Sequence, residues 1–171
     1  MNKPKIILLA GLAGSGKSTY AAKLSKENPN IKIVSSDSIR EKIFGNVNDQ
    51  SHNYEIFSKI IPEQIRRGIA WMNDVIIDAT SINHKDRKSY IQLANQLNVD
   101  IECHYFPADI ELAKKQNAGR DRKVPEWVID KMANKWQEPS IDEGFSHVVN
   151  IKRHEALNKL TEETERLKLY E

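Results

Sequence analysis

Cysteine occurs once in the 171 residues, as Cys103, so the chain can form no internal disulfide. No apolar stretch near the N-terminus has the length of a signal peptide or a membrane span. A chain of this length buries enough surface to fold without disulfides. We therefore expect one domain over residues 1–171, in a reducing cytoplasm and with no membrane partner.

Charge of one sign does not dominate either, since the formal net charge is +2. No global positive field marks the chain as a nucleic-acid binder, so such a partner would have to bind a local patch. The chain also contains no internal repeat, no low-complexity tract and no Pro/Gly/Ser-rich linker that would divide it.

Five short apolar runs, partly β-branched, predict strands at 5–10, 31–36, 74–79, 99–106 and 146–151. Segments with helical spacing lie between them, including 51–73, where Pro62 marks a kink or a break, and 83–98. This alternation predicts an α/β fold with a mainly parallel five-stranded sheet covered on both faces. The segment 153–170 has the spacing of a helix, which we expect to cap the domain and only pack against it.

The stretch 11–19, "GLAGSGKST", follows the first predicted strand and opens a helix. It fits the phosphate-loop pattern G-x-x-x-x-G-K-[ST] in the context that the pattern requires. Its backbone N–H groups and the helix N-terminus suit the phosphates of ATP, and the serine hydroxyl suits Mg²⁺. The predicted cofactor residues are Gly11, Gly14, Ser15, Gly16, Lys17, Ser18 and Thr19. The alternative is a glycine-rich turn with no ligand.

The second strand leads into "SSDSIR", which holds Asp37 and, three residues later, Arg40. Ligands in such sheets bind beyond the carboxyl ends of the strands. There Asp37 can accept the proton of an attacking hydroxyl, while Arg40 binds an anionic part of the same acceptor. The alternative is that Asp37 caps the helix and Arg40 is a solvated surface charge.

The third strand ends in "DVIIDAT", so Asp78 also lies at the predicted edge. A carboxylate there can orient Mg²⁺ through water or hold a neighbouring polar group, so we assign Ser18 and Asp78 to the metal site. The alternative is a strand-terminal residue that is satisfied by backbone N–H groups.

The stretch "QNAGRDRKVPEW" connects two predicted helices that start near Asp109 and Pro125. Its glycine, proline and crowded basic residues are typical of a mobile connection, so we predict a lid at about 117–124. When a lid closes, Arg120 or Arg122 can neutralise charge on a transferring phosphoryl group. A solvated basic loop is the alternative.

The phosphate loop, "SSDSIR", "VIIDAT" and "QNAGRDRKVPEWVIDKM" occur in an order and spacing similar to those of polynucleotide 5′-hydroxyl kinases, both the phage enzymes and the kinase module of bacterial RNA end-repair proteins. The resemblance covers residues 5 to about 150. It implies a single three-layer α/β/α P-loop NTPase domain with a small lid.

The resemblance also implies roles for single residues. Lys17 and Ser18 bind ATP and Mg²⁺, Asp37 is the general base for the 5′-hydroxyl, and Arg40 contacts the acceptor strand. The lid arginine that touches the ATP phosphates matches Arg120 if one residue is missing from the lid. Counting back from "VP" instead gives Arg122 or Gly119.

This chain departs from the family at two points. Gln116 stands where many relatives place an arginine, and the chain is too short to carry the phosphatase or ligase modules to which relatives are commonly fused. We therefore expect the acceptor to be a nucleic-acid 5′-hydroxyl end, DNA or RNA, or a smaller hydroxyl compound such as a nucleoside, sugar or sugar nucleotide.

A nucleotide-operated switch or motor is disfavoured, because the chain has neither an N-K-x-D motif nor an Asp-Glu pair after the third strand. A further basic cluster is either part of the acceptor surface or a solvated face; it comprises Arg66, Arg67, Lys85, Arg87 and Lys88.

Overall fold

The computed structural model describes residues 2–168, apart from the side chain of residue 153. Its five strands form one parallel sheet in the order β2-β3-β1-β4-β5. The strands are β1 (Ile6–Ala10), β2 (Ile31–Ser35), β3 (Asp74–Asp78), β4 (Ile101–Tyr105) and β5 (His147–Asn150). The predicted parallel sheet is thereby confirmed.

The helices fill the intervals between the strands. They are α1 (Lys17–Glu27), α2 (Ser36–Phe44), α3 (Asn53–Glu55), the π-helical segment η1 (Ile56–Ile60), α4 (Ile61–Ala70), α5 (His84–Leu97), α6 (Ile110–Ala118), α7 (Glu126–Asn134), the 3₁₀ turn η2 (Ile141–Glu143) and α8 (Ile151–Lys168). Pro62 lies in the first turn of α4, directly after η1. The irregularity expected at this proline is therefore a change of helix type.

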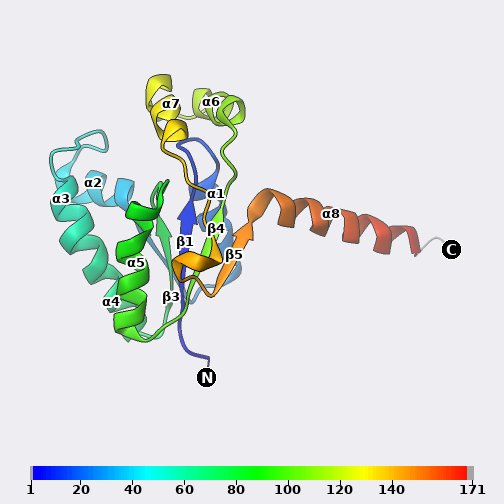
Figure 1. The fold of residues 1–171 in the computed structure, drawn as a ribbon, viewed down its shortest axis with the longest axis horizontal. Coiled ribbons are helices and arrows are strands. Elements are labelled where there is room, and N and C mark those ends of the chain that lie inside the picture. Colours follow the sequence, from blue (N-terminus) through cyan, green and yellow to red (C-terminus); the bar gives the residue numbers. More distant parts are fainter. Residues whose placement is uncertain (1, 169–171) are drawn as a thin grey trace.

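The two faces of the sheet are covered by different helices (Figure 1). Ile6 and Leu8 of β1 pack into the larger core with side chains of α4 and α5, whereas Ile7 and Leu9 pack with Ala21 of α1. Successive side chains of a strand point to opposite faces, so a continuous apolar run such as "IILLA" fits a strand that is buried on both sides. The result is the predicted three-layer α/β/α domain.

The parallel register aligns the carboxyl ends of the three strands that precede the predicted site. Ser35 of β2 lies opposite Asp78 of β3, and the Gly11 N–H after β1 donates to the Thr80 carbonyl after β3 at 3.0 Å. The phosphate loop, the start of α2 and the loop after β3 therefore meet at one edge of the sheet.

The prediction for the C-terminal segment is wrong in one respect. A helix is present over Ile151–Lys168, and residues 169 and 170 of the predicted span lie outside the described residues. However, α8 extends away from the body of the domain (Figure 1), and its apolar side chains Leu157, Leu160 and Leu167 are exposed. Neither α8 nor any other helix within residues 2–168 is long and apolar enough to cross a membrane.

Candidate active site

A cleft with a volume of about 1620 Å³ opens at the carboxyl edge of the sheet. It is lined by the phosphate loop, the start of α2, the loop after β3, the lid segment and one side of α7. The predicted site residues that line it are Gly14, Ser15, Gly16, Lys17, Ser18, Thr19, Asp37, Arg40, Asp78, Arg120 and Arg122. Gly11 lies at the base of the loop and is buried. The structure thus brings together residues that are up to about a hundred positions apart in the sequence.

The phosphate loop depends on glycine at two positions. Gly14 has φ +81° and Gly16 has φ +100°, in the left-handed region that other residues rarely adopt. A Cβ atom on Gly14 would also lie 2.5 Å from the Ala113 carbonyl oxygen of α6. The loop backbone therefore packs directly against α6 at Gly14, where a larger side chain would not fit.

Lys17 begins α1 and is buried beneath the loop, with 7% of its surface exposed. Its ammonium donates to the carbonyls of Gly11 at 3.0 Å and Leu12 at 2.8 Å. The pKa of this amine is lowered to about 8, chiefly by burial; the charge of Asp78 opposes the shift and that of Arg120 adds to it. Lys17 is thus an amine that an anion in the cleft can hold in its charged form.

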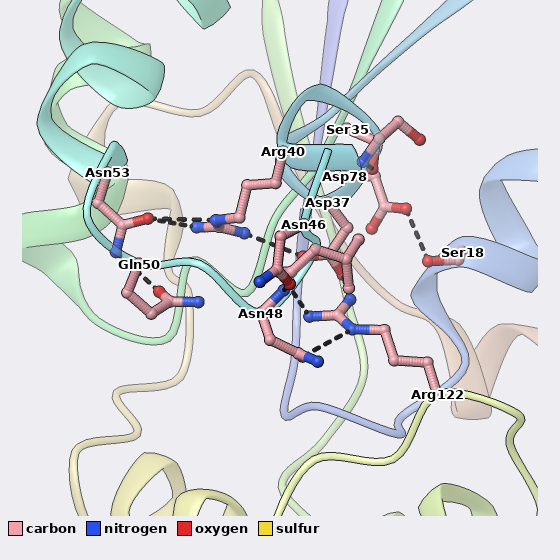
Figure 2. Close-up of polar contacts among 12 residues, drawn as sticks. Ser18, Ser35, Asp37, Arg40, Asn46, Asn48, Gln50, Asn53, Asp78 and Arg122 are labelled. Carbon is pink, nitrogen blue, oxygen red and sulfur yellow. Dashed lines mark hydrogen bonds and ion pairs between the residues drawn. The ribbon is translucent and has the colours of Figure 1, made fainter. Parts of the chain in front are cut away.

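Ser18 and Asp78, the two residues that the sequence suggests for a metal site, lie in direct contact at the cleft. The Ser18 hydroxyl donates to Oδ2 of Asp78 at 2.7 Å (Figure 2). A hydroxyl and a carboxylate are hard oxygen donors of the kind that Mg²⁺ prefers, and Mg²⁺ is usually held by one or two such groups together with water and phosphate oxygens. The pair fits Mg²⁺ in that manner. Within residues 2–168, no group of three or more His, Cys, Asp or Glu side chains forms a closed metal cage.

Asp37 lies in the first turn of α2 and Arg40 at the start of the second, and the side chain of Ser35 caps the helix by accepting from the Ser38 N–H. The cap is thus a serine, and the Asp37 carboxylate is free to face the cleft. Arg40 Nη1 donates to Oδ1 of Asp37 at 3.0 Å, and the Asp37 side chain is 46% exposed. The alternative in which Asp37 serves only as a cap does not describe this geometry.

Arg40 is buried, which contradicts its alternative interpretation as a solvated surface charge. Its Nε and Nη2 both donate to Oδ1 of Asn53, at 3.2 and 2.6 Å, and Gln50 in turn accepts from the Asn53 amide at 2.8 Å. The Phe57 ring lies 5.8 Å from the guanidinium carbon. These contacts orient the guanidinium before any acceptor arrives.

Arg122 of the lid segment lies against Asp37 from the opposite side (Figure 2). Its Nη1 is 2.6 Å from Oδ2 of Asp37, and its Nη2 and Nε donate to the Val47 carbonyl and to Oδ1 of Asn48. The guanidinium therefore ties the lid segment to the loop after α2. Each oxygen of the Asp37 carboxylate is bonded to an arginine.

Arg120 is half-buried and lies close enough to Lys17 for its charge to lower the pKa of that amine. It forms no ion pair with any residue that the structure describes. Both arginines line the cleft, and Arg122 contacts Asp37.

Several polar residues of this site were not singled out from the sequence. Asn117, which is 3% exposed, donates to the Val124 carbonyl at 2.7 Å and accepts from the Val124 N–H at 3.0 Å, so it joins the two ends of the lid segment. Asn48, Gln50 and Asn53 hold the two arginines around Asp37. The only signal for them is the amide-rich stretch "NVNDQSHN", which resembles an ordinary surface loop.

Tyr20 lines the same cleft, and its hydroxyl lies 2.7 Å from Nδ1 of His104. Burial raises the pKa of this phenol to about 12 and lowers the pKa of His104. The pair therefore contributes a neutral hydrogen bond beside the phosphate loop.

The basic cluster suggested for the acceptor surface does not form one surface. Lys85 lines the cleft, whereas Arg66, Arg67 and Lys88 do not. Arg87 is fully buried and bonds to Glu143 at 2.8 Å and to the carbonyls of Ser81 and Gln137. The assignment of Arg87 to a surface is wrong, because its charge is used inside the domain.

Comparison with known proteins gives one family match. The model of a family described as AAA domain matches residues 6–139. Among curated proteins, the chain is 26% identical over 152 residues to the bifunctional polynucleotide phosphatase/kinase of Schizosaccharomyces pombe, covering 86% of this chain and 33% of that protein. It is 27% identical over 144 residues to the L-seryl-tRNA(Sec) kinase of Methanococcus maripaludis, covering 78% of this chain and 53% of that protein. The chain thus spans only a third to a half of these relatives.

Solved structures share the fold. A chain of the Pnkp1/Rnl/Hen1 RNA repair complex superposes with a TM-score of 0.69 at 23% identity, over 79% of this chain and 44% of that chain. The gluconokinase of Sinorhizobium meliloti superposes with a TM-score of 0.60 at 14% identity, over 88% and 83%. At these sequence identities, the superpositions show a shared fold and nothing about function.

Proposed function

Because the chain belongs to the AAA domain family of P-loop kinases, we propose that it transfers the γ-phosphoryl group of ATP to the 5′-hydroxyl end of a polynucleotide. The relatives include kinases of polynucleotides and kinases of small molecules. The choice between these acceptors depends on the cleft.

The main support for a polynucleotide acceptor is the excess of positive charge among the residues that line the cleft. Eleven of its lining residues are Lys or Arg and four are Asp or Glu. The whole chain has 26 basic and 24 acidic residues, so the remainder holds 15 basic and 20 acidic ones. Positive charge is thus concentrated where the substrates bind, on a molecule that is otherwise acidic. ATP accounts for part of this charge, and a polyanionic acceptor suits the rest.

In the proposed reaction, Asp37 accepts the proton of the 5′-hydroxyl as its oxygen bonds to the γ-phosphorus. The bond between the γ-phosphorus and the bridging oxygen breaks, and its electron pair leaves with ADP. Lys17 and Arg120 balance the charge on the phosphoryl group. When bound by Ser18 and Asp78, Mg²⁺ supplies further charge neutralisation.

Arg40 serves in this scheme as an acceptor-binding group. Its guanidinium has N–H groups left over after it bonds to Asn53 and Asp37, and its side chain is already fixed by burial. A guanidinium that is ordered in advance loses little entropy when it binds a phosphate. Arg122 must release or share the Asp37 carboxylate before the hydroxyl can bond to it.

The test is a labelling experiment with γ-labelled ATP. The acceptors are 5′-hydroxyl DNA and RNA oligonucleotides, the same oligonucleotides with a 5′-phosphate, nucleosides, and sugars including gluconate. We expect label on the 5′-hydroxyl oligonucleotides and none on the 5′-phosphorylated ones. Label that appears only on a nucleoside or a sugar would replace the polynucleotide by a small acceptor.

The variant Asp37→Asn tests the base. We expect transfer to fall by about 10²-fold to 10⁴-fold, the usual contribution of general base catalysis, with the ATP dissociation constant within about threefold of the parent value. Asp86→Asn removes another exposed carboxylate that lines the cleft and is the matched control. Equal losses in both variants, or a parallel loss of ATP binding in Asp37→Asn, would refute the role of Asp37.

A further inference from the structure

Helix α7 presents three distinct sides to its surroundings. Ile129 is fully buried in a small core with Leu12 and Ala113. Asp130 pairs with Lys114 of α6 at 2.8 Å. The third side bears Trp127 and Lys131 and continues into Lys135, the residue directly after the helix; all three line the cleft. We call these three residues the α7 stripe.

The α7 stripe has no partner among the residues that the structure describes. Trp127 is 64% exposed, and within residues 2–168 the structure records no ion pair or hydrogen bond from the side-chain ammonium of either lysine. Large aromatic side chains are usually buried, and an exposed one within a cleft points to a binding surface. The acids of α7 are turned toward α6, so the charge on the cleft side is purely positive.

The spacing of the stripe suits a linear polyanion. Trp127 and Lys131 are four residues apart, so they share one side of the helix with a rise of about 6 Å between them. Lys135 follows at the same interval as the cap residue of the helix, with its backbone still in the right-handed helical region. This rise is comparable with the separation of successive phosphates along an extended single strand. The stripe therefore places one aromatic platform ahead of two positive charges, at intervals that a nucleotide chain can match.

The two ends of the α7 stripe reach different parts of the cleft wall. The stripe starts next to the lid, and its far end meets the start of α5, where the Gln137 N–H donates to the Ile82 carbonyl at 2.8 Å and the Gln137 side chain accepts from the His84 N–H at 2.9 Å. Lys85, in the first turn of α5, continues the row of positive charge along the cleft. The row thus connects the lid segment with the start of α5 along the wall of the cleft.

We propose that the α7 stripe binds the nucleotides that follow the 5′-terminal one in a single-stranded acceptor, with a base stacked on Trp127 and phosphates on Lys131 and Lys135. This inference rests on the proposed polynucleotide acceptor and adds a second site to it. Stacking on an aromatic ring and neutralisation of phosphates bind single strands with little regard to sequence. The stripe thus makes affinity depend on acceptor length.

The experiment compares acceptor lengths. The Michaelis constants of 5′-hydroxyl acceptors of one, two, four and eight nucleotides are measured, together with equilibrium binding of a 3′-labelled octanucleotide by fluorescence anisotropy. We expect the Michaelis constant of the parent protein to fall with length. Trp127→Ala should weaken octanucleotide binding by about 5-fold to 150-fold, the range for one stacked base.

The lysines are tested by the salt dependence of binding. Lys131→Ala/Lys135→Ala should reduce the slope of log Kd against log salt concentration by about 1.4, since each phosphate contact with a single strand contributes about 0.7. The matched control is Lys26→Ala/Lys59→Ala, which removes two exposed lysines that do not line the cleft. The control should leave the slope and the length dependence as they are.

The outcomes separate the two proposals. If octanucleotides are phosphorylated but the stripe variants bind them as the parent does, the α7 stripe is refuted and the polynucleotide acceptor stands. If strands of every length neither bind nor accept phosphate, both proposals fail. If Trp127→Ala weakens ATP binding more than octanucleotide binding, Trp127 belongs to the donor site and the inference is overturned.

Discussion

Lys17 combines a buried position with a pKa lowered to about 8, with burial as the largest cause. Without a ligand, the amine therefore loses its proton as the pH rises through 8. The phosphates of ATP favour the charged form, so binding should raise this pKa and draw in a proton at alkaline pH. The terminal phosphate of ATP is already ionised there, so the proton is taken up by the protein.

Raising the pH should therefore weaken ATP binding. We expect the ATP dissociation constant to increase by about fivefold between pH 8 and pH 9, with proton uptake seen by calorimetry in buffers of different ionisation enthalpy. Lys23→Met, which removes an exposed lysine of the same cleft, should keep this profile. An affinity that is constant from pH 7 to pH 9.5 would show that Lys17 keeps its proton in the free protein.

The lid segment and the loop after α2 are joined by Arg122. It contacts Asp37 at 2.6 Å, and it also bonds to Val47 and Asn48. Both side chains of the ion pair are partly exposed, so solvent screens it and its net contribution is about 1 kcal/mol or less. Such a contact restrains the lid segment without adding much to the stability of the whole domain.

The variant Arg122→Ala should therefore loosen two segments and spare the rest. We expect amide hydrogen exchange to become about threefold to tenfold faster at residues 119–123 and at 46–49, with the free energy of unfolding lowered by less than about 1 kcal/mol. Lys123→Ala, which changes an exposed neighbour, is the control. Faster exchange at 119–123 alone would mean that the two segments are independent.

Arg87 joins α5 to two segments that lie about fifty residues further along the chain. It bonds to the Glu143 carboxylate at 2.8 Å, to the Gln137 carbonyl and to the carbonyl of Ser81, which has a left-handed φ of 45°. With no exposure of its side chain, Arg87 is fully desolvated, and Glu143 is only 10% exposed. Removing one partner leaves a buried charge without compensation.

We expect Arg87→Met to lower the free energy of unfolding by about 3 to 5 kcal/mol in urea denaturation. The double variant Arg87→Met/Glu143→Leu should recover part of this loss, because the orphaned carboxylate is removed while the two carbonyls still lack their donor. Lys88→Met, at an exposed position of the same helix, should change stability by less than about 0.5 kcal/mol. A small effect of Arg87→Met would indicate that water replaces the guanidinium.

For the molecule as a whole, the layers follow from patterns that act locally. Runs such as "IILLA" and "DVIID" are short, partly β-branched and separated by helical segments, which favours buried strands, and the phosphate-loop motif indicates which edge of the sheet holds the predicted site. Asp37, Asp78 and the lid arginines were found because each follows a strand or breaks a helical pattern.

Other features depend on what lies opposite a residue in space. The charge of Arg87 looks like that of Lys88 in the sequence, yet only Arg87 meets a carboxylate from a distant turn. The exposed side of α7 could not be told from its buried sides, because the positions that α6 and the core cover are set by the packing of α6 on α7. The direction of α8 is a third case, since spacing defines an apolar side but not a surface to receive it.

Because α8 extends away from the domain (Figure 1), its loss should have little effect on the stability of the whole domain. Leu157, Leu160 and Leu167 are 57%, 60% and 65% exposed, so they add little buried apolar area to the fold. A chain that ends at Ala156 should therefore keep its free energy of unfolding within about 0.5 kcal/mol, measured by urea denaturation. Ile151→Ala is the matched control, because Ile151 at the start of α8 is 2% exposed and its truncation should cost about 2 to 5 kcal/mol.

A helix that capped the domain with three buried leucines would instead contribute about 1.5 to 3 kcal/mol for each of them to the free energy of unfolding. A loss of that size in the shortened chain would show that α8 folds back onto the body in solution.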